Sequence, residues 1–131
     1  MSRQPLVLLV SGDRLAGMTT ANSLVGYGYE MLLPSTVEEA GHLLRTNRRI
    51  SVLVIDTDLG PAGAGLSLAR DSRVSDPNLK VIYTSRMPFR LQDAEKVSGA
   101  PCLRTPYRPH QLAGVISQLV RQIAPEEAYA A

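Results

Sequence analysis

The stretch SVLVIDTDLGPAGAGLSLAR (residues 51–70) carries the strongest structural signal of the chain. An apolar run from Val52 to Ile55 leads directly into Asp56 and Asp58, and a loop of glycine, proline and alanine follows. A short run that is apolar at every position is typical of a strand buried on both faces, as in a parallel sheet. We therefore expect a buried strand here, followed by a helix over residues 65–73.

The rest of the chain repeats this alternation of strand and helix. Short apolar runs predict the remaining strands at residues 6–10, 29–33, 80–83 and 102–104. Apolar spacing and capping residues predict the remaining helices at residues 14–27, from Ser35 or Thr36 onward, and at 89–98 and 109–123. In the helix at 14–27, the residues expected to face the core are Leu15, Met18, Ala21, Leu24 and Val25. Because parallel strands need helical crossovers that cover the sheet, the pattern predicts an α/β fold.

Length and composition limit the classes of protein that fit. The 131 residues suit one domain, which we expect over residues 1–124, with a frayed tail at 125–131. The 14 basic and 12 acidic residues are mostly scattered, so a nucleic-acid partner is not indicated. No membrane segment or targeting signal is recognisable. The single cysteine, Cys102, rules out an internal disulfide and suits a reducing compartment, so we expect a cytoplasmic protein.

Polar residues follow the expected strands at the points where the strands end. In open parallel sheets the functional crevice lies beyond the carboxyl ends of the strands. The residues delivered to that edge are Ser11, Gly12, Asp13, Asp56, Thr57, Asp58, Thr84, Ser85, Arg104, Thr105 and Pro106. A site built around Asp56 is therefore expected there.

Two other kinds of site are not indicated. His42 and His110 have no second histidine or cysteine at the spacing of metal ligands. The glycines of GPAGAG (residues 60–65) lack the lysine of a phosphate-binding loop and do not follow the first strand, as a dinucleotide fingerprint would. These glycines are expected to permit a tight turn beside the site.

The order of several segments resembles the receiver domain of two-component response regulators. These segments are VLVIDTDLG, GLSLA, VIYTS, Thr-Pro-Tyr-Arg-Pro after the last strand, and LVGYGYEMLLPSTVEEA. The match extends from about residue 6 to residue 120. The resemblance implies a flavodoxin-like, doubly wound (βα)5 fold with a five-stranded parallel sheet in the order 2-1-3-4-5.

The same resemblance implies a role for particular residues. Asp56 falls on the position that accepts a phosphoryl group from a histidine kinase, and Thr84 on the hydroxyl that senses it. Asp13, Asp56 and Asp58 are the candidates for a weak Mg²⁺ site. The protein would be a signalling module in a phosphorelay, acting by protein–protein interaction and not as an enzyme.

Four positions depart from the family pattern. Ser11 and Gly12 stand where the family has its acidic pair, and Thr105 occupies the lysine position. Arg104 is adjacent, but neighbouring side chains of a strand point to opposite faces. Cys102 replaces the aromatic switch residue. We therefore expect weak metal binding and weak phosphorylation, in a stand-alone atypical receiver.

The expected contact surface lies on the fourth helix, fifth strand and fifth helix. Its residues are Arg86, Met87, Phe89, Arg90 and Tyr107. A histidine kinase or another signalling protein is the expected partner, and a homodimer through this face is a further expectation. Packing of the fourth helix onto the sheet is the alternative explanation for Phe89.

Other interpretations of the same residues stay open. Asp56 could cap its own loop, and Thr84 and Ser85 could hydrogen-bond only the loop that they begin. A small flavodoxin-like domain that binds a nucleotide or flavin is the alternative function, although no aromatic pair is placed to sandwich a ring. The chain could also be a receiver segment of a longer regulator or hybrid kinase.

Overall fold

Five parallel strands form one sheet in the computed structural model, which describes residues 4–121. The strands are β1 (Leu6–Val10), β2 (Glu30–Leu32), β3 (Ile50–Asp56), β4 (Lys80–Ser85) and β5 (Cys102–Arg104). Their order in the sheet is β2-β1-β3-β4-β5, and every neighbouring pair is parallel. The predicted α/β class and strand order are confirmed.

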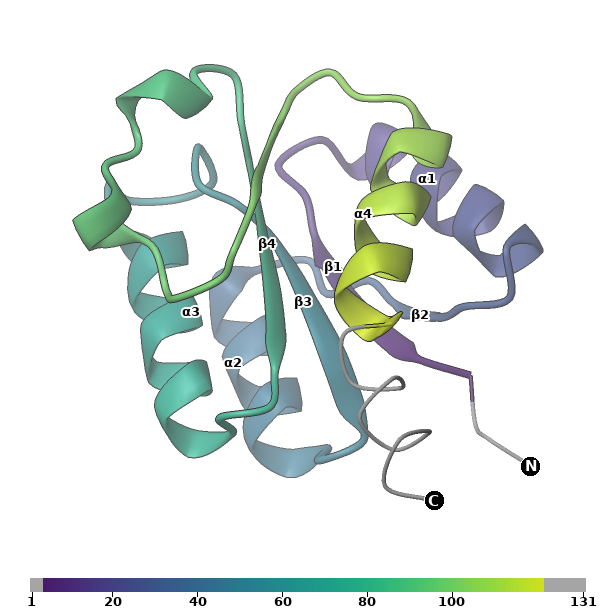
Figure 1. The fold of residues 1–131 in the computed structure, drawn as a ribbon, viewed down its shortest axis with the longest axis horizontal. Helices are drawn as coiled ribbons and strands as arrows, with labels where there is room; N and C mark the ends of the chain where they lie inside the picture. Colours follow the sequence, from purple (N-terminus) through teal and green to yellow (C-terminus); the bar gives the residue numbers. More distant parts are fainter. Residues whose placement is uncertain (1–3, 122–131) are drawn as a thin grey trace.

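Helices cover both faces of this sheet (Figure 1). They are α1 (Arg14–Gly26), α2 (Val37–Thr46), α3 (Ala64–Ser75) and α4 (Pro109–Arg121). In Figure 1, α2 and α3 lie on one side of the strands, and α1 and α4 on the other. Within residues 4–121, no helix is long and apolar enough to cross a membrane. The expected end of the last helix, residues 122–123, and the tail at 125–131 lie outside the described residues.

The two sides of β1 explain why its sequence is apolar at every position. Leu6, Leu8 and Val10 belong to the core cluster under α2 and α3, whereas Val7 and Leu9 belong to the cluster under α1 and α4. All five side chains are at least 95% buried. Burial of a Val or Leu side chain contributes roughly 1.5–3 kcal/mol. The strand is therefore fixed inside the sheet, between β2 and β3.

The prediction of a fourth helix at residues 89–98 is wrong. Two single-turn 3₁₀ helices form there instead: η1 (Pro88–Arg90) and η2 (Asp93–Glu95). The two residues between them are extended, and the N–H of Gln92 donates to the Glu95 carboxylate at 3.0 Å, which starts a new turn. This local hydrogen bond competes with continued α-helix. The described residues therefore contain four α-helices and not the five of the expected (βα)5 pattern.

The predicted buried stripe of α1 is only partly right. Ala21 and Leu24 are buried, together with Gly17 and Thr20, at helical spacing. Three apolar side chains expected in the core are exposed instead: Leu15 (74%), Met18 (46%) and Val25 (57%). They lie three and seven residues apart, so they share the outer face of the helix. The small residues Gly17 and Ala21 let α1 approach the sheet closely.

Tyr83 anchors the irregular segment between β4 and β5. Its side chain is fully buried, and its hydroxyl oxygen accepts a hydrogen bond from the Val97 N–H at 3.0 Å. Burial raises the pKa of the Tyr83 phenol, and the hydrogen bond from Val97 and the nearby Arg73 partly offset that effect. The connection is thus tied to the core although it contains no α-helix.

Candidate functional site

Asp56 is the last residue of β3, at the edge of the sheet where the parallel strands end. Thr84 is its register partner on the neighbouring strand β4. The loop that follows β1 lies on the other side, because β1 pairs with β3 up to Val10 and Ile55. The topology therefore brings the residues that follow three strands to one place.

The carboxylate of Asp56 is half-buried and ties two loops together. Its Oδ1 accepts the N–H of Asp58 at 2.9 Å, and its Oδ2 accepts the N–H of Gly12 at 3.3 Å. The interpretation of Asp56 as a loop-capping carboxylate accounts for these bonds. That role leaves the carboxylate at the accessible edge, so it is compatible with a reactive role.

Gly12 lies in close contact with Asp56. A Cβ atom at this position would lie 3.0 Å from Oδ2 of Asp56 and 3.8 Å from Cδ1 of Leu59. The first distance is shorter than ordinary van der Waals contact, so any side chain at residue 12 would push the Asp56 carboxylate away. An acidic residue at this position would therefore not simply restore a metal ligand.

A cavity of about 450 Å³ opens beside Asp56, and we call it the Asp56 cavity. Its lining residues are Ser11, Gly12, Asp13, Ala16, Thr20, Asp56, Asp58, Arg86, Thr105, Pro106 and Tyr107. It brings together four of the five site residues predicted from the sequence, since Asp13, Asp58 and Thr105 all face the space beside Asp56. The Thr105–Pro106 peptide is cis.

Thr84, the remaining predicted site residue, lies beside Asp56 but does not line the cavity. Only 3% of its surface is exposed, and its carbonyl oxygen accepts the N–H of Thr57 at 2.9 Å. Ser85 is also buried, and its Oγ accepts the N–H of Met87 at 3.0 Å. For Ser85, the expectation that it hydrogen-bonds the loop it begins is confirmed.

The polar side chains of the first loop are engaged in local hydrogen bonds. Oδ1 of Asp13 accepts the N–H of Ala16 at 3.1 Å and caps α1. The Ser11 hydroxyl donates to the Asp13 carbonyl oxygen and accepts the Asp13 N–H. Within residues 4–121, no three carboxylate, histidine or cysteine side chains are grouped closely enough to hold one metal ion. Mg²⁺ in proteins is usually held by one or two carboxylates together with waters and substrate phosphates, and here Asp13 caps α1 and Asp58 pairs with Arg86, so these carboxylates are a poor donor set for it.

Arg86 enters the site in a way that the sequence did not indicate. Its Nε lies 3.5 Å from Oδ2 of Asp58, and its backbone N–H donates to the same oxygen at 3.0 Å. Arg86 is the one basic residue among those that line the Asp56 cavity in the described part of the chain. Arg104 is exposed and does not line it, whereas Thr105 does.

Tyr107 closes the side of the cavity next to α1. Burial raises the pKa of its phenol; a hydrogen bond with the Thr20 side chain lowers it, and the Asp56 carboxylate raises it further. The influence of Asp56 places its negative charge within electrostatic range of the ring hydroxyl. Tyr107 was predicted as a surface contact, and the structure shows it half-buried at the cavity wall.

Cys102, at the position of the aromatic switch, is half-buried on β5 beside Tyr83. Burial raises the pKa of its thiol, so the thiol is protonated at neutral pH. Its side chain packs against the core cluster under α2 and α3. The residue therefore acts in packing, as its surroundings in the sequence indicate.

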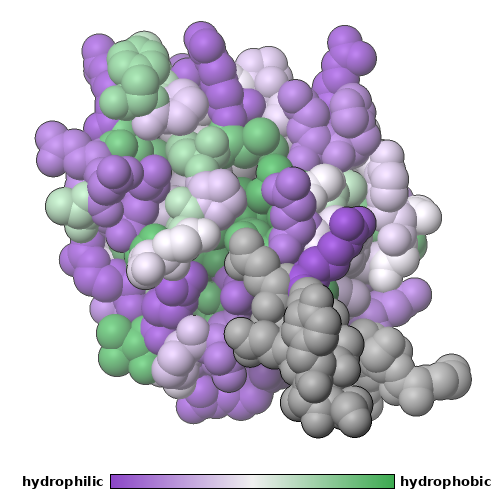
Figure 2. All heavy atoms as spheres, viewed as in Figure 1, coloured by the Kyte–Doolittle hydropathy of each residue, from purple (hydrophilic) through white to green (hydrophobic). Residues whose placement is uncertain are grey.

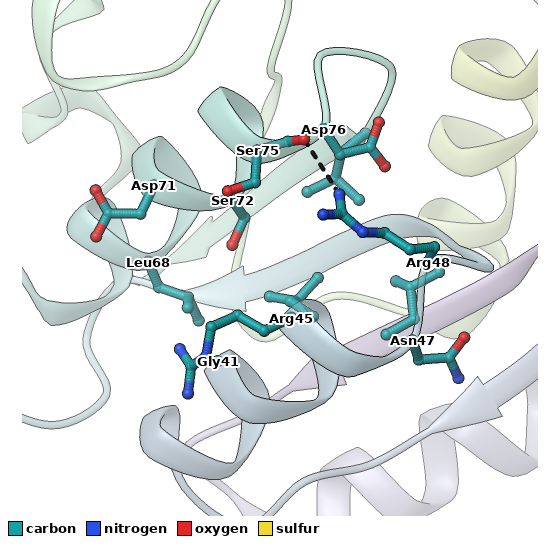
Figure 3. Close-up of a pocket in the computed structure, with 12 residues that line it drawn as sticks. Gly41, Arg45, Asn47, Arg48, Leu68, Asp71, Ser72, Ser75 and Asp76 are labelled. Atoms are coloured by element: carbon teal, nitrogen blue, oxygen red, sulfur yellow. Dashed lines mark hydrogen bonds between the residues drawn. The ribbon is translucent and has the colours of Figure 1, made fainter.

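A second cavity, of about 220 Å³, lies between α2 and α3 at the opposite edge of the sheet (Figure 3). Arg48 reaches across it and donates to the Ser75 carbonyl oxygen at 3.2 Å. Arg45 and Asp71 lie on opposite helices at its rim. Its floor is formed by Leu44, Ile50, Leu68 and Leu79. The Asp56 cavity lies instead at the carboxyl ends of the parallel strands, where functional sites of such sheets are found, so it is the better candidate site.

Solved structures with the same fold include several response regulator receiver proteins. One from Sinorhizobium medicae is 22% identical, with a TM-score of 0.78 over 90% of this chain and 95% of that chain. A CheY-like receiver domain protein from Methanospirillum hungatei is 20% identical, with a TM-score of 0.79 over 94% and 98%. The receiver domain of the hybrid histidine kinase CckA is 23% identical, with a TM-score of 0.74 over 87% and 97%.

These similarities establish the fold that the resemblance predicted. No family model matches the chain, and no curated protein matches its sequence. The three sequence identities are all below 25%, so the similarity to these proteins lies in the fold more than in the sequence. Function must therefore be argued from the residues at the Asp56 cavity.

Proposed function

We propose that residues 1–124 form a receiver domain of the response regulator type, which takes part in phosphorelay signalling and accepts a phosphoryl group weakly on Asp56. The observation that carries this proposal is the position of Asp56, half-buried at the end of β3 beside a cavity of about 450 Å³. The similarity in fold to receiver domains supports it, although similarity of fold alone does not establish function.

The chemistry of such a transfer sets the demands on the site. A carboxylate and a phosphoryl group are both anionic, so the site must offer positive charge or hydrogen-bond donors where the phosphoryl oxygens come to lie. The N–H groups of Gly12 and Asp58 already point at the two oxygens of Asp56. Thr105 lines the cavity and Thr84 lies beside Asp56, so their hydroxyls are candidate donors. These neutral groups stabilise charge less than a metal ion or a lysine does, so we expect phosphorylation to be weak.

Incubation with a small acyl phosphate tests this proposal. We expect slow incorporation of one phosphoryl group, followed by intact mass, and its loss in Asp56→Asn. The matched control is Asp93→Asn, because Asp93 is a fully exposed carboxylate on η2 and away from the cavity. The control should label at the native rate. Equal labelling of native protein and Asp56→Asn, or no labelling of the native protein, would contradict the proposed role.

We further propose that the protein acts by binding a signalling partner, such as a histidine kinase. The η1 surface, formed by Arg86, Met87, Phe89 and Arg90, is the candidate contact, whereas Tyr107 lies in the cavity wall. Phe89 is 77% exposed, so packing onto the sheet is excluded as its role. Figure 2 shows hydrophobic atoms among hydrophilic ones at the end of the molecule that carries η1. An exposed aromatic with arginine neighbours suits a partner with apolar and acidic side chains.

A further inference from the structure

The charges that line the Asp56 cavity are unevenly distributed. Three acidic residues line it, Asp13, Asp56 and Asp58, and one basic residue, Arg86. Thr105 contributes only a hydroxyl where a second cation would be expected. The carboxylates are a poor donor set for Mg²⁺, because Asp13 caps α1 and Asp58 pairs with Arg86. Any positive charge provided by the described protein atoms of this cavity therefore comes from Arg86.

We infer that Arg86 is the cation of this site, binding the oxygens of a phosphoryl group at Asp56 in place of a metal ion. The inference rests on the proposed function and names the residue that makes the transfer possible. A guanidinium has its N–H donors in a planar fork that matches two oxygens of a phosphoryl group. It carries a full charge at any accessible pH, so its action needs no change of protonation.

The present contacts of Arg86 allow its side chain to leave Asp58 and bind a phosphoryl group. Its backbone N–H is held by Asp58 at 3.0 Å, which fixes the residue at the rim of the cavity. Its side chain is 80% exposed and pairs with Asp58 at 3.5 Å. An exposed pair of this length contributes at most about 1 kcal/mol. A phosphoryl group carries up to about two negative charges, so it competes well with the single charge of Asp58.

The transfer itself is balanced without any further reactant. An oxygen of the Asp56 carboxylate attacks the phosphorus of an acyl phosphate, and a new P–O bond forms. The P–O bond to the acyl group breaks, and the carboxylate of the donor leaves with the electron pair. No proton, oxidant or reductant is required. In this step Arg86 would contact the equatorial oxygens of the transferring group, where negative charge is spread.

Labelling rates with acetyl phosphate in EDTA test the inference. We expect the native protein to label in EDTA, Arg86→Gln to label at least about tenfold more slowly, and Arg86→Lys to fall between them, since a charge-assisted hydrogen bond contributes roughly 1.5–3 kcal/mol. Arg90→Gln is the matched control, because it removes the same charge from an exposed arginine nearby that does not line the Asp56 cavity. It should stay within about twofold of the native rate.

A second measurement separates contact from a general effect of charge. The Nε–H resonance of Arg86, assigned by comparison with Arg86→Lys, should shift on labelling, while that of Arg90 should not. If labelling required added Mg²⁺ and had the same rate in Arg86→Gln as in the native protein, the inference would be overturned and the proposed function would remain intact. Absence of labelling in every condition would overturn both. An unchanged Arg86 resonance in labelled protein would also overturn the inference.

Discussion

Gly12 and Asp56 are so close that each limits what the other position can hold. A Cβ atom at residue 12 would lie 3.0 Å from Oδ2 of Asp56, although the two residues are 44 positions apart in the sequence. The backbone of Gly12 is not in the left-handed region, so glycine is needed for space and not for conformation. The family pattern marks this position as a missing metal ligand, whereas the structure gives it a steric role.

A double-mutant cycle tests this contact. Gly12→Ala should lower the free energy of unfolding by about 1 kcal/mol, because the new methyl group displaces the Asp56 carboxylate and breaks the bond from the residue 12 N–H. In an Asp56→Ala background the same change should have much less effect, since the obstructing oxygen is gone. Urea unfolding of the four proteins gives the coupling energy. Equal losses in both backgrounds would show that the contact is unimportant.

The site residues could be predicted from the sequence only where a strand delivers them. Asp56 is the last residue of β3 and Thr84 the last but one of β4, and both strands have clear apolar runs, so their place at one edge followed from the fold. Arg86 lies beyond the strand end, where the path of the loop decides whether its side chain meets Asp58 or solvent. Residue propensities and apolar periodicity cannot predict the path of that loop. The arginine therefore looked like a surface residue.

At the scale of elements, two buried helical glycines differ in how much room their neighbours leave for a side chain. A Cβ at Gly41 in α2 would meet the flexible end of Arg45 at 3.1 Å and Leu68 at 3.4 Å. A Cβ at Gly65 in α3 would meet Ile55 at 3.0 Å and the backbone oxygen of Asp56 at 3.3 Å. The first neighbours can move at little cost. The second are a core side chain and fixed backbone.

This difference predicts opposite signs for two alanine substitutions. Gly41→Ala should raise the free energy of unfolding by up to about 1 kcal/mol, because alanine favours a helix over glycine. Gly65→Ala should lower it by roughly 1–3 kcal/mol, because the new methyl group overpacks the contact between α3 and β3. Urea unfolding measures both values, and each variant serves as the control for the other. A loss in both, or a gain in both, would contradict the packing described.

The sequence-based predictions failed where the apolar residues do not define a single buried face of a helix. The segment at residues 89–98 has apolar residues, but the bond from the Gln92 N–H to the Glu95 carboxylate divides it into two short turns. Helix α1 has apolar residues on both faces, so the sequence could not show that Leu15 and Met18 face outward. The strands were predictable because a strand buried on both faces is apolar at every position, so no single buried face has to be identified.

At the scale of the whole molecule, the η1 surface and the outer face of α1 are two separate exposed apolar regions. Phe89 dominates the first and Leu15 the second, with 77% and 74% of each residue exposed. A homodimer through the η1 surface would be two-fold symmetric and would bring the arginines of both copies together. Repulsion between these like charges weakens such a dimer at low salt. An acidic partner would not meet this repulsion.

Sedimentation equilibrium at low and high salt tests self-association through this surface. We expect a dimer fraction that rises with salt, because screening reduces the repulsion between arginines, and that disappears in Phe89→Ser. Leu15→Ser is the matched control, since it removes an equally exposed apolar side chain from α1. It should leave the dimer fraction unchanged. A dimer that survives Phe89→Ser, or a monomer at every salt concentration, would rule out this interface.

The location of the phosphoryl group in labelled protein tests the central claim most directly. Borohydride reduces an aspartyl phosphate but not a free carboxylate, so tandem mass spectrometry of the treated protein identifies the modified residue. We predict that the reduced residue is Asp56, which lies at the end of β3 and lines the same cavity as Arg86. Reduction at Asp13 or Asp58 instead, with Asp56 unmodified, would contradict the account of this site.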